Sequence, residues 1–122
     1  MPSRTDAGGP APPGDVEAFL AATPPFDALD REQRLQAAAA LSVHYARLGE
    51  RPLRTGDPGR LLFLVRRGAV ELTEPEGGLV ARLGEGACFG HAALLTGEPA
   101  RFEVRTIEDT LYYTLPADAF RA

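Results

Sequence analysis

Residues 84–106 read GEGACFGHAALLTGEPARFEVRT, and this stretch says most about the fold of the chain. Gly90 stands directly before an apolar helical turn at residues 91–95, where a glycine lets successive backbone N–H groups point outward at an anion. The sequence Thr-Gly-Glu-Pro at 96–99 then ends the helix. Residues 102–106 alternate in character with the period of a strand that buries one face. The stretch therefore predicts a short helix joined to a strand by a turn that can hold a small anion.

This segment resembles the phosphate-binding cassette of the cyclic nucleotide-binding domains, which runs Phe-Gly-Glu-hydrophobic-Ala-Leu-Leu, a short turn, and Pro-Arg-Ser/Thr-Ala. The lengths agree without a gap. The matching positions are Phe89, Gly90, Ala93, Leu94, Leu95, Gly97, Pro99 and Val104. The resemblance extends over roughly residues 16–122 and implies a mainly β fold. We expect a double-stranded β-helix, or jelly roll, with helices before it and a truncated helix after it.

The departures from the family pattern concern ligand chemistry. His91 stands where the family has the Glu that accepts a hydrogen bond from the ribose 2′-hydroxyl, and Ala100 replaces the Arg that pairs with the phosphate. Arg101 occupies the next position, and one step along an extended chain turns a side chain to the opposite face. The resemblance implies a cassette formed by Phe89, Gly90, His91, Ala92, Pro99, Ala100 and Arg101.

Two side chains of the cassette have competing interpretations. In the functional interpretation, the imidazole of His91 donates a hydrogen bond to an anion or accepts one from a hydroxyl. In the other interpretation, His91 is a partly exposed polar residue that fills the place of the lost Glu. The guanidinium of Arg101 can complete an anion site beside the helix N–H groups, or form an outward ion pair with Glu98 or Glu103. Both interpretations of His91 stay open, and the functional one is favoured for Arg101.

Composition limits the class of protein. At 122 residues the chain is long enough for one domain with its own core. All 13 basic residues are Arg, and the net charge of −4 argues against nonspecific binding of nucleic acid. No apolar run approaches the roughly 20 residues of a membrane span, and no secretory signal begins the chain. We therefore expect a cytoplasmic protein, and the single cysteine, Cys88, weakly favours a reducing compartment.

The chain divides into a tail and one domain. Residues 1–14 are rich in Pro and Gly and are expected to be disordered, so the domain covers 15–122. Asp15 is expected to cap a first helix that buries Val16, Phe19 and Leu20. Asp30 is expected to cap a second helix, residues 31–42. Its predicted buried face consists of Leu35, Ala38, Ala39 and Leu41.

From Val43 the apolar period shortens to two, between turns rich in Gly and Pro. This pattern predicts a barrel-like roll with a hairpin turn at 75–78. The predicted strands are residues 43–48, 51–54, 61–66, 69–74, 79–83, 101–107 and 110–115.

Residues outside the cassette offer little chemistry. Cys88 fits a buried strand position better than a reactive thiol. His44 lies far in sequence from His91, and no set of residues at metal-ligand spacing accompanies it. Of the adjacent Tyr112 and Tyr113, one ring is expected in the core and the other toward solvent or a partner. With two His in the chain, a metal-dependent cupin-type enzyme is a poor interpretation, and no catalytic triad is visible.

The favoured function is a regulatory, non-enzymatic module with a degenerate cassette, which binds a small anion, nucleotide or otherwise, weakly or not at all. The stretches LLTGEPARFEV and EDTLYYTLPADAF are similar to the amino-terminal modules of bacterial signalling proteins that carry CBS pairs and nucleotidyltransferase-like domains. The alternative is a genuine receptor for cyclic AMP or cyclic GMP. No other cofactor, no metal, no membrane and no direct nucleic-acid contact are expected.

The resemblance also implies a larger polypeptide. In the family, a helix after the roll folds over the ligand and passes the signal to an effector, so we expect a downstream effector domain beyond residue 122. Homodimerisation is common among relatives, but no heptad pattern in this chain requires it.

Overall fold

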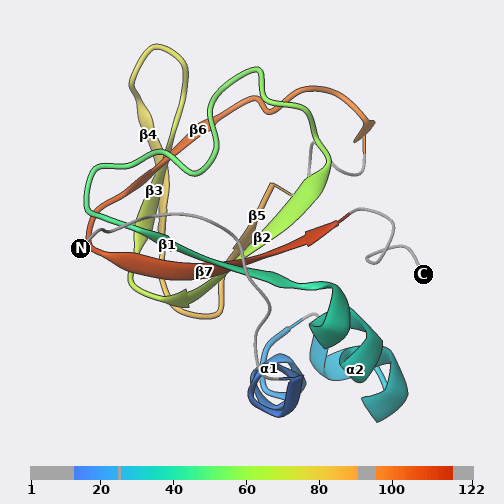
Figure 1. Ribbon diagram of the computed structural model, residues 1–122. Helices are drawn as coiled ribbons and strands as arrows, with labels where there is room; N and C mark the ends of the chain where they lie inside the picture. Colours follow the sequence, from blue (N-terminus) through green and yellow to red (C-terminus); the bar gives the residue numbers. More distant parts are fainter. Residues whose placement is uncertain (1–12, 25, 91–95, 117–122) are drawn as a thin grey trace.

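Helices come first along the chain and antiparallel strands follow, in the order that the periodicity predicts. The computed structural model describes residues 13–24, 26–90 and 96–116. The helices lie together below the strands in the view of Figure 1.

The first helix, α1 (Pro13–Ala21), buries one face. Val16 and Leu20 are fully buried, as their spacing predicts. The helix begins at Pro13, so Asp15 lies within it and the expected N-cap at Asp15 is wrong. Proline is favoured in the first turn of a helix, because the N–H that it lacks would have no helical acceptor there.

A short 3-10 helix, η1 (Phe26–Ala28), leads to the second helix, α2 (Arg31–Ala40). Asp30 is the N-cap of α2, as predicted, and its Oδ1 accepts a hydrogen bond from the Gln33 N–H at 2.8 Å. The Gln33 side chain accepts in return from the Asp30 N–H at 3.0 Å. This capping box satisfies two of the backbone donors that a helix leaves free at its start.

The buried face of α2 differs slightly from the prediction. Ala38 is buried and Leu41 is buried just after the helix, but Ala39 is exposed and Ala37 is buried in its place. Leu35 is only half-buried. The four consecutive alanines of α2 have the same side chain, so their order cannot indicate which of them face the core, and the angle at which the helix packs decides it.

The strands form two antiparallel sheets. One has the order β1-β7-β2-β5 and the other the order β4-β3-β6. The strands are β1 (Ser42–Ala46), β2 (Leu61–Arg67), β3 (Val70–Thr73), β4 (Leu79–Leu83), β5 (Cys88–Phe89), β6 (Glu103–Thr106) and β7 (Thr110–Pro116). The predicted hairpin between β3 and β4 is confirmed, with the Glu74 N–H bonded to the Gly78 carbonyl at 2.8 Å.

One expectation about the strands is wrong. Residues 51–54 form no strand, and only an isolated bridge joins Leu53 to Val104. Pro52 removes a ladder donor from this segment, which limits its pairing. Cys88 and Phe89 form a two-residue strand, in accord with the strand position favoured for Cys88 from the sequence.

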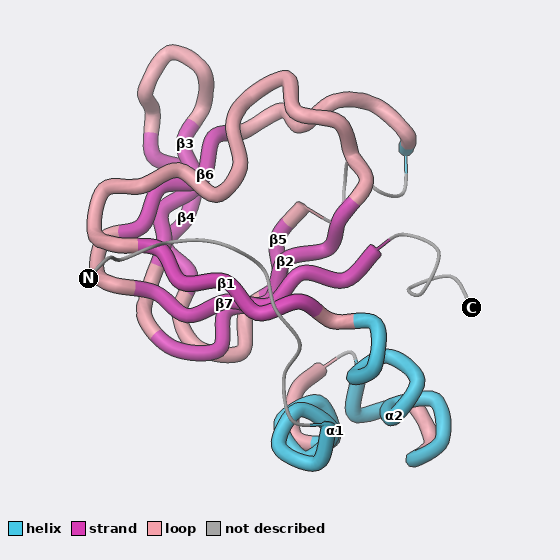
Figure 2. The backbone as a smooth tube through the Cα atoms, viewed as in Figure 1, coloured by secondary structure: helices cyan, strands magenta, loops and turns pink. Residues whose placement is uncertain are grey.

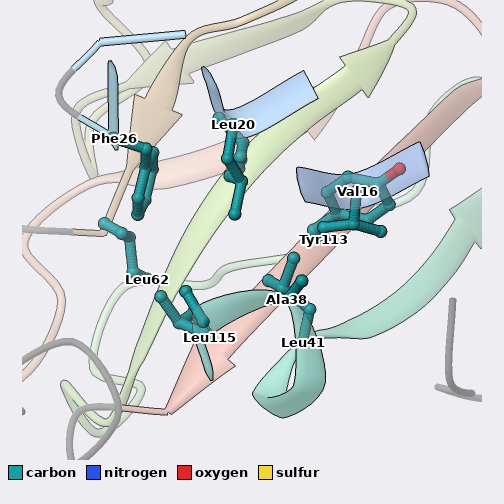
Figure 3. Packing of buried hydrophobic residues seen from close by; sticks show 10 residues of the cluster. Val16, Leu20, Phe26, Ala38, Leu41, Leu62, Tyr113 and Leu115 are labelled. Atoms are coloured by element: carbon teal, nitrogen blue, oxygen red, sulfur yellow. The ribbon is translucent and has the colours of Figure 1, made fainter. Parts of the chain in front are cut away.

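The four-stranded sheet carries an apolar core on each face. Leu62 and Leu64 of β2 point toward the helices, whereas Phe63 and Val65 point into the roll. Figure 3 shows the helix-side core, in which Leu62, Tyr113 and Leu115 meet side chains of α1 and α2. The roll-side core consists of Leu53, Phe63, Val65, Val70, Phe89, Ala100 and Val104.

Charged contacts attach the helices to each other and to the sheet. Arg34 of α2 forms an ion pair with Glu17 of α1 at 2.7 Å, and both side chains are largely buried. The Arg66 guanidinium of β2 lies 4.5 Å from the ring centroid of Phe19 and pairs with Glu85 at 3.3 Å. A cation over an aromatic face is attracted by the ring quadrupole, so Arg66 links α1 to the turn before β5.

Among the helices of the described ranges, none combines the length and the apolar composition that crossing a bilayer would require.

The capping box yields a stability prediction. Asp30→Ala should lower the free energy of unfolding by about 1 kcal/mol, because the Gln33 N–H loses its acceptor. Urea unfolding followed by circular dichroism measures this change. Asp27→Ala, at another exposed aspartate in η1, is the control and should change the unfolding free energy by less than about 0.5 kcal/mol. Equal effects of the two substitutions would contradict the role of the cap.

Candidate functional site

The cassette begins in the strand β5, at the edge of the four-stranded sheet. Phe89 pairs with Phe63 of β2, and the two rings stack with centroids 4.8 Å apart. Phe89 is almost completely buried. Of the predicted cassette residues, Phe89 therefore serves as an anchor in the roll-side core, which fixes where the chain leaves the sheet.

Gly90 has a conformation that requires glycine. Its φ is +85°, and a Cβ added there would lie 2.9 Å from Cδ1 of Phe63 and 3.2 Å from the Leu61 carbonyl oxygen. The prediction of a conformationally special glycine at the start of the cassette is confirmed. The turn lets the backbone leave β5 tightly against the Phe63 ring.

His91 and Ala92 lie outside the described residues, as do the three residues that follow them, so the expected helical turn and both interpretations of His91 remain predictions. The description resumes at Thr96. Pro99 is exposed.

Ala100 faces inward. Its methyl group belongs to the roll-side core, and the residue is only 5% exposed. Its backbone is held on both sides by the loop after β1, with the Gly56 N–H bonded to the Ala100 carbonyl at 2.8 Å and the Ala100 N–H bonded to the Asp57 carbonyl at 2.8 Å. Figure 2 shows this loop running beside the segment that leads into β6. The position of the family's phosphate-pairing arginine is thus occupied by a buried methyl group.

Arg101 is exposed, in accord with the change of face expected one residue along an extended chain. Its guanidinium carbon lies 5.8 Å from the ring centroid of Phe102. In the described ranges it forms no ion pair, and Glu103 pairs instead with Arg51 at 3.0 Å. The proposed outward ion pair to Glu98 or Glu103 is therefore absent from this part of the structure, and the guanidinium rests on a neighbouring ring.

The sequence did not predict the two hydrogen bonds between the loop after β1 and the backbone of Ala100. Residues 56–59 were identified as a turn, but no pattern indicated that this turn would bind the cassette across 40 or more residues of chain. The partner of a turn is decided by the closure of the roll, which single-sequence patterns do not contain.

Cys88 is half-buried and packs against the helix-side core, as the favoured interpretation expects. Burial raises the pKa of its thiol from 9.0 to about 11, because the thiolate is poorly solvated there. Such a thiol is protonated at neutral pH and is a poor nucleophile.

The remaining candidate residues pack inside the fold. Tyr113 lies in the helix-side core with its ring at a right angle to Phe19, and Tyr112 stacks on His44 with centroids 5.1 Å apart on the roll side. Neither tyrosine ring is turned fully to solvent, because both faces of the sheet are covered. In the part of the chain that the structure describes, no three His, Cys, Asp or Glu side chains are grouped as a metal site.

Comparison with known proteins gives a consistent family assignment. The family model described as Cyclic nucleotide-binding domain matches residues 43–122. Glutaminase 1 of Bradyrhizobium diazoefficiens is 37% identical over 76 residues, which is 62% of this chain and 12% of that protein. The cAMP-dependent protein kinase regulatory subunit of Debaryomyces hansenii is 25% identical over 104 residues, 85% of this chain and 23% of that protein. The chain thus spans a small part of these curated relatives.

Solved structures agree on the fold. The regulatory subunit of a cAMP-independent protein kinase A from Trypanosoma brucei superimposes with a TM-score of 0.85 at 23% identity, over 89% of this chain and 40% of that one. The regulatory domain of Toxoplasma gondii PKA, crystallised with cAMP, gives 0.84 at 24% identity, over 89% and 44%. The predicted jelly roll with preceding helices is confirmed.

Gly90→Ala should destabilise the protein more than Gly97→Ala. Both glycines have positive φ, which costs an alanine about 1–2 kcal/mol, but only the Gly90 position has the Phe63 ring and a backbone oxygen within contact distance. We expect a further loss of about 1–3 kcal/mol at Gly90 from overpacking. Thermal and urea unfolding of the two variants measure the difference, and equal losses would show that the Phe63 contact is unimportant.

Alkylation of Cys88 should be slow in the folded protein. With the thiol pKa at about 11 instead of 9.0, the thiolate fraction at pH 7.5 is about 100-fold smaller than in the unfolded chain. Iodoacetamide labelling with and without urea measures the ratio. An alkylation rate of the folded protein equal to the rate in urea at pH 7.5 would contradict the burial of the thiol.

The raised pKa of Cys88 also predicts how stability depends on pH. Because only the unfolded thiol ionises between pH 9.0 and about 11, the free energy of unfolding should fall as the pH rises through that range.

Proposed function

The chain belongs to the cyclic nucleotide-binding domain family, and we propose that it is a regulatory module with altered anion chemistry. In this proposal the cassette retains its backbone framework and binds a small anion, of nucleotide type or otherwise, weakly or not at all. The domain binds a ligand or a partner and carries out no reaction of its own.

The observation that carries the proposal is the pair Ala100 and Arg101. An inward methyl group stands at the phosphate-pairing position, and the guanidinium stands one residue later on the exposed side. A charge-assisted hydrogen bond contributes about 1.5–3 kcal/mol, so its loss weakens binding by about one to two orders of magnitude. His91, in place of the family's Glu, removes a further ribose contact in this proposal.

The framework of the cassette supports retention of some ligand. Phe89 is anchored in the core and Gly90 keeps the left-handed turn that opens the cassette. Backbone N–H groups at the start of a helix attract anions whatever the neighbouring side chains are. The helical turn that the sequence predicts at residues 91–95 would offer such N–H groups to a weakly bound phosphate-containing ligand.

A genuine receptor for cyclic AMP or cyclic GMP is the second candidate. The relatives include several cAMP-dependent protein kinase regulatory subunits and a cyclic nucleotide-gated potassium channel of Mesorhizobium japonicum. Arg101 has no carboxylate partner in the described ranges, so its guanidinium could turn toward a phosphate at the cost of leaving the Phe102 ring. His91 would then contact the ribose.

The module is proposed to control a separate effector. The relatives that share this segment are several times longer, and their names describe an enzyme, kinase regulators and a channel. Ligand or partner contact would shift the cassette relative to the flanking helices, and the shift in population would pass to the effector. A CBS-linked signalling protein of the bacterial cytoplasm, with or without homodimerisation, remains our proposal for the context.

Calorimetry with cyclic AMP and cyclic GMP tests the cassette. The double variant Ala100→Arg/Arg101→Ala moves the guanidinium by one residue at constant net charge, and Arg101→Ala is its matched control. We expect the double variant to bind cyclic AMP about 10 to 100 times more tightly than the unaltered chain, since it regains a charge-assisted contact. Thermal unfolding of both variants checks that the arginine at the buried position leaves the fold intact.

Micromolar, saturable binding by the unaltered chain that disappears in Arg101→Ala would overturn the altered-cassette proposal and establish the receptor. A deletion tests the regulatory role separately. If a longer parent protein keeps its activity and ligand response after residues 1–122 are deleted, the module has no regulatory role.

A further inference from the structure

A concavity lies at the β1 edge of the four-stranded sheet. It has a volume of about 170 Å³, and its lining includes His44, Glu50, Arg51, Pro52 and Tyr112. In the order β1-β7-β2-β5, two strands separate this edge from β5, where the cassette begins. The concavity is therefore separated from the start of the cassette at β5, and Arg51 in its lining pairs with Glu103, two residues after Arg101 at the end of the cassette.

One wall of the concavity is aromatic and firmly held. His44 and Tyr112 are direct partners in the β1–β7 ladder, and their rings stack 14° from parallel. The His44 Nε2 lies 2.9 Å from the hydroxyl of Thr114, a buried residue, and the Tyr112 ring packs on Phe63 of the roll-side core. These contacts fix both rings before any ligand arrives.

The backbone of Glu50, in the lining of the concavity, is held by a buried threonine. Thr106 is 1% exposed, and its backbone N–H donates to the Glu50 carbonyl at 2.9 Å. Its hydroxyl bonds to the Arg47 carbonyl at 2.5 Å and accepts from the Glu50 N–H at 3.1 Å. Arg51 is oriented by its ion pair with Glu103 at 3.0 Å. The backbone of Glu50 and the guanidinium of Arg51 are thus each held in place in the lining of the concavity.

We propose that this concavity binds a planar heteroaromatic ring of the guanine type. The aromatic wall offers a face or edge for ring contact. The Glu50 carboxylate accepts hydrogen bonds from N–H groups on one edge of the ring. Arg51 has five N–H donors, so it can keep Glu103 and still donate to ring O and N acceptors.

The volume sets the size of the ligand. The volume of about 170 Å³ lies below the roughly 300 Å³ where drug-sized pockets begin. A nucleobase enters such a space, whereas an attached sugar stays at the open mouth. A whole nucleotide does not fit inside it.

Guanosine and inosine test the proposal, because inosine lacks only the exocyclic amine that would donate to Glu50. We expect guanosine to bind about 10 to 100 times more tightly than inosine, with NMR shifts at the backbone amides of His44, Glu50 and Arg51. Glu50→Gln should reduce this preference, because a neutral amide oxygen accepts more weakly than a carboxylate, and the amide oxygen can still accept the Arg47 N–H that Glu50 now accepts at 3.3 Å.

Two controls separate this site from the cassette and from general charge effects. Arg101→Ala changes the cassette, and Glu76→Gln removes a charge from the exposed turn between β3 and β4. Both variants should keep the preference for guanosine. The proposal is overturned if millimolar guanosine shifts none of the named amides, if the shifts are confined to Gly90 and Arg101, or if Glu50→Gln retains the preference in full.

Discussion

The structure depends on one sheet that is apolar on both faces. Strand β2 runs Leu62, Phe63, Leu64, Val65, and consecutive side chains enter opposite cores. A sheet of this kind cannot leave either face in water, because each buried aliphatic or aromatic side chain contributes about 1.5–3 kcal/mol. The helices cover one face and the second sheet covers the other, so the layered arrangement follows from this strand.

The cassette is positioned by the same constraint. Phe89 extends the roll-side core to the edge strand, and Gly90 turns the chain where a Cβ would meet Phe63. At the other end, Ala100 is buried in that core, and its backbone is hydrogen-bonded to residues 56 and 57. Both ends of the cassette are therefore held by packing and by backbone hydrogen bonds. These contacts do not need an arginine at position 100, so the family fold can persist while a ligand-contacting residue changes.

The concavity lies at the β1 edge of the four-stranded sheet, and the cassette begins at the β5 edge. Phe63 contacts Phe89 on the cassette side and Tyr112 on the other side, and Tyr112 stacks on His44. A continuous row of rings thus joins the two edges. Contact alone is not coupling, and an energetic link would require an element with two arrangements.

Local patterns in the sequence determined much of this protein. The Asp30 cap, the Gly90 turn, the β3–β4 hairpin and the alternating strands depend on neighbours a few residues apart, whose steric and hydrogen-bonding rules are local. The period of an extended chain also predicts that Ala100 and Arg101 face opposite sides, but packing decides that Ala100 is the inward residue. Only the tertiary structure decided which alanines of α2 are buried, that residues 51–54 pair through a single bridge, and that His44 meets Tyr112 beside Glu50. These depend on how the roll closes and on the angle at which a helix packs, which bring together residues separated by tens of positions and leave no periodic trace in the chain.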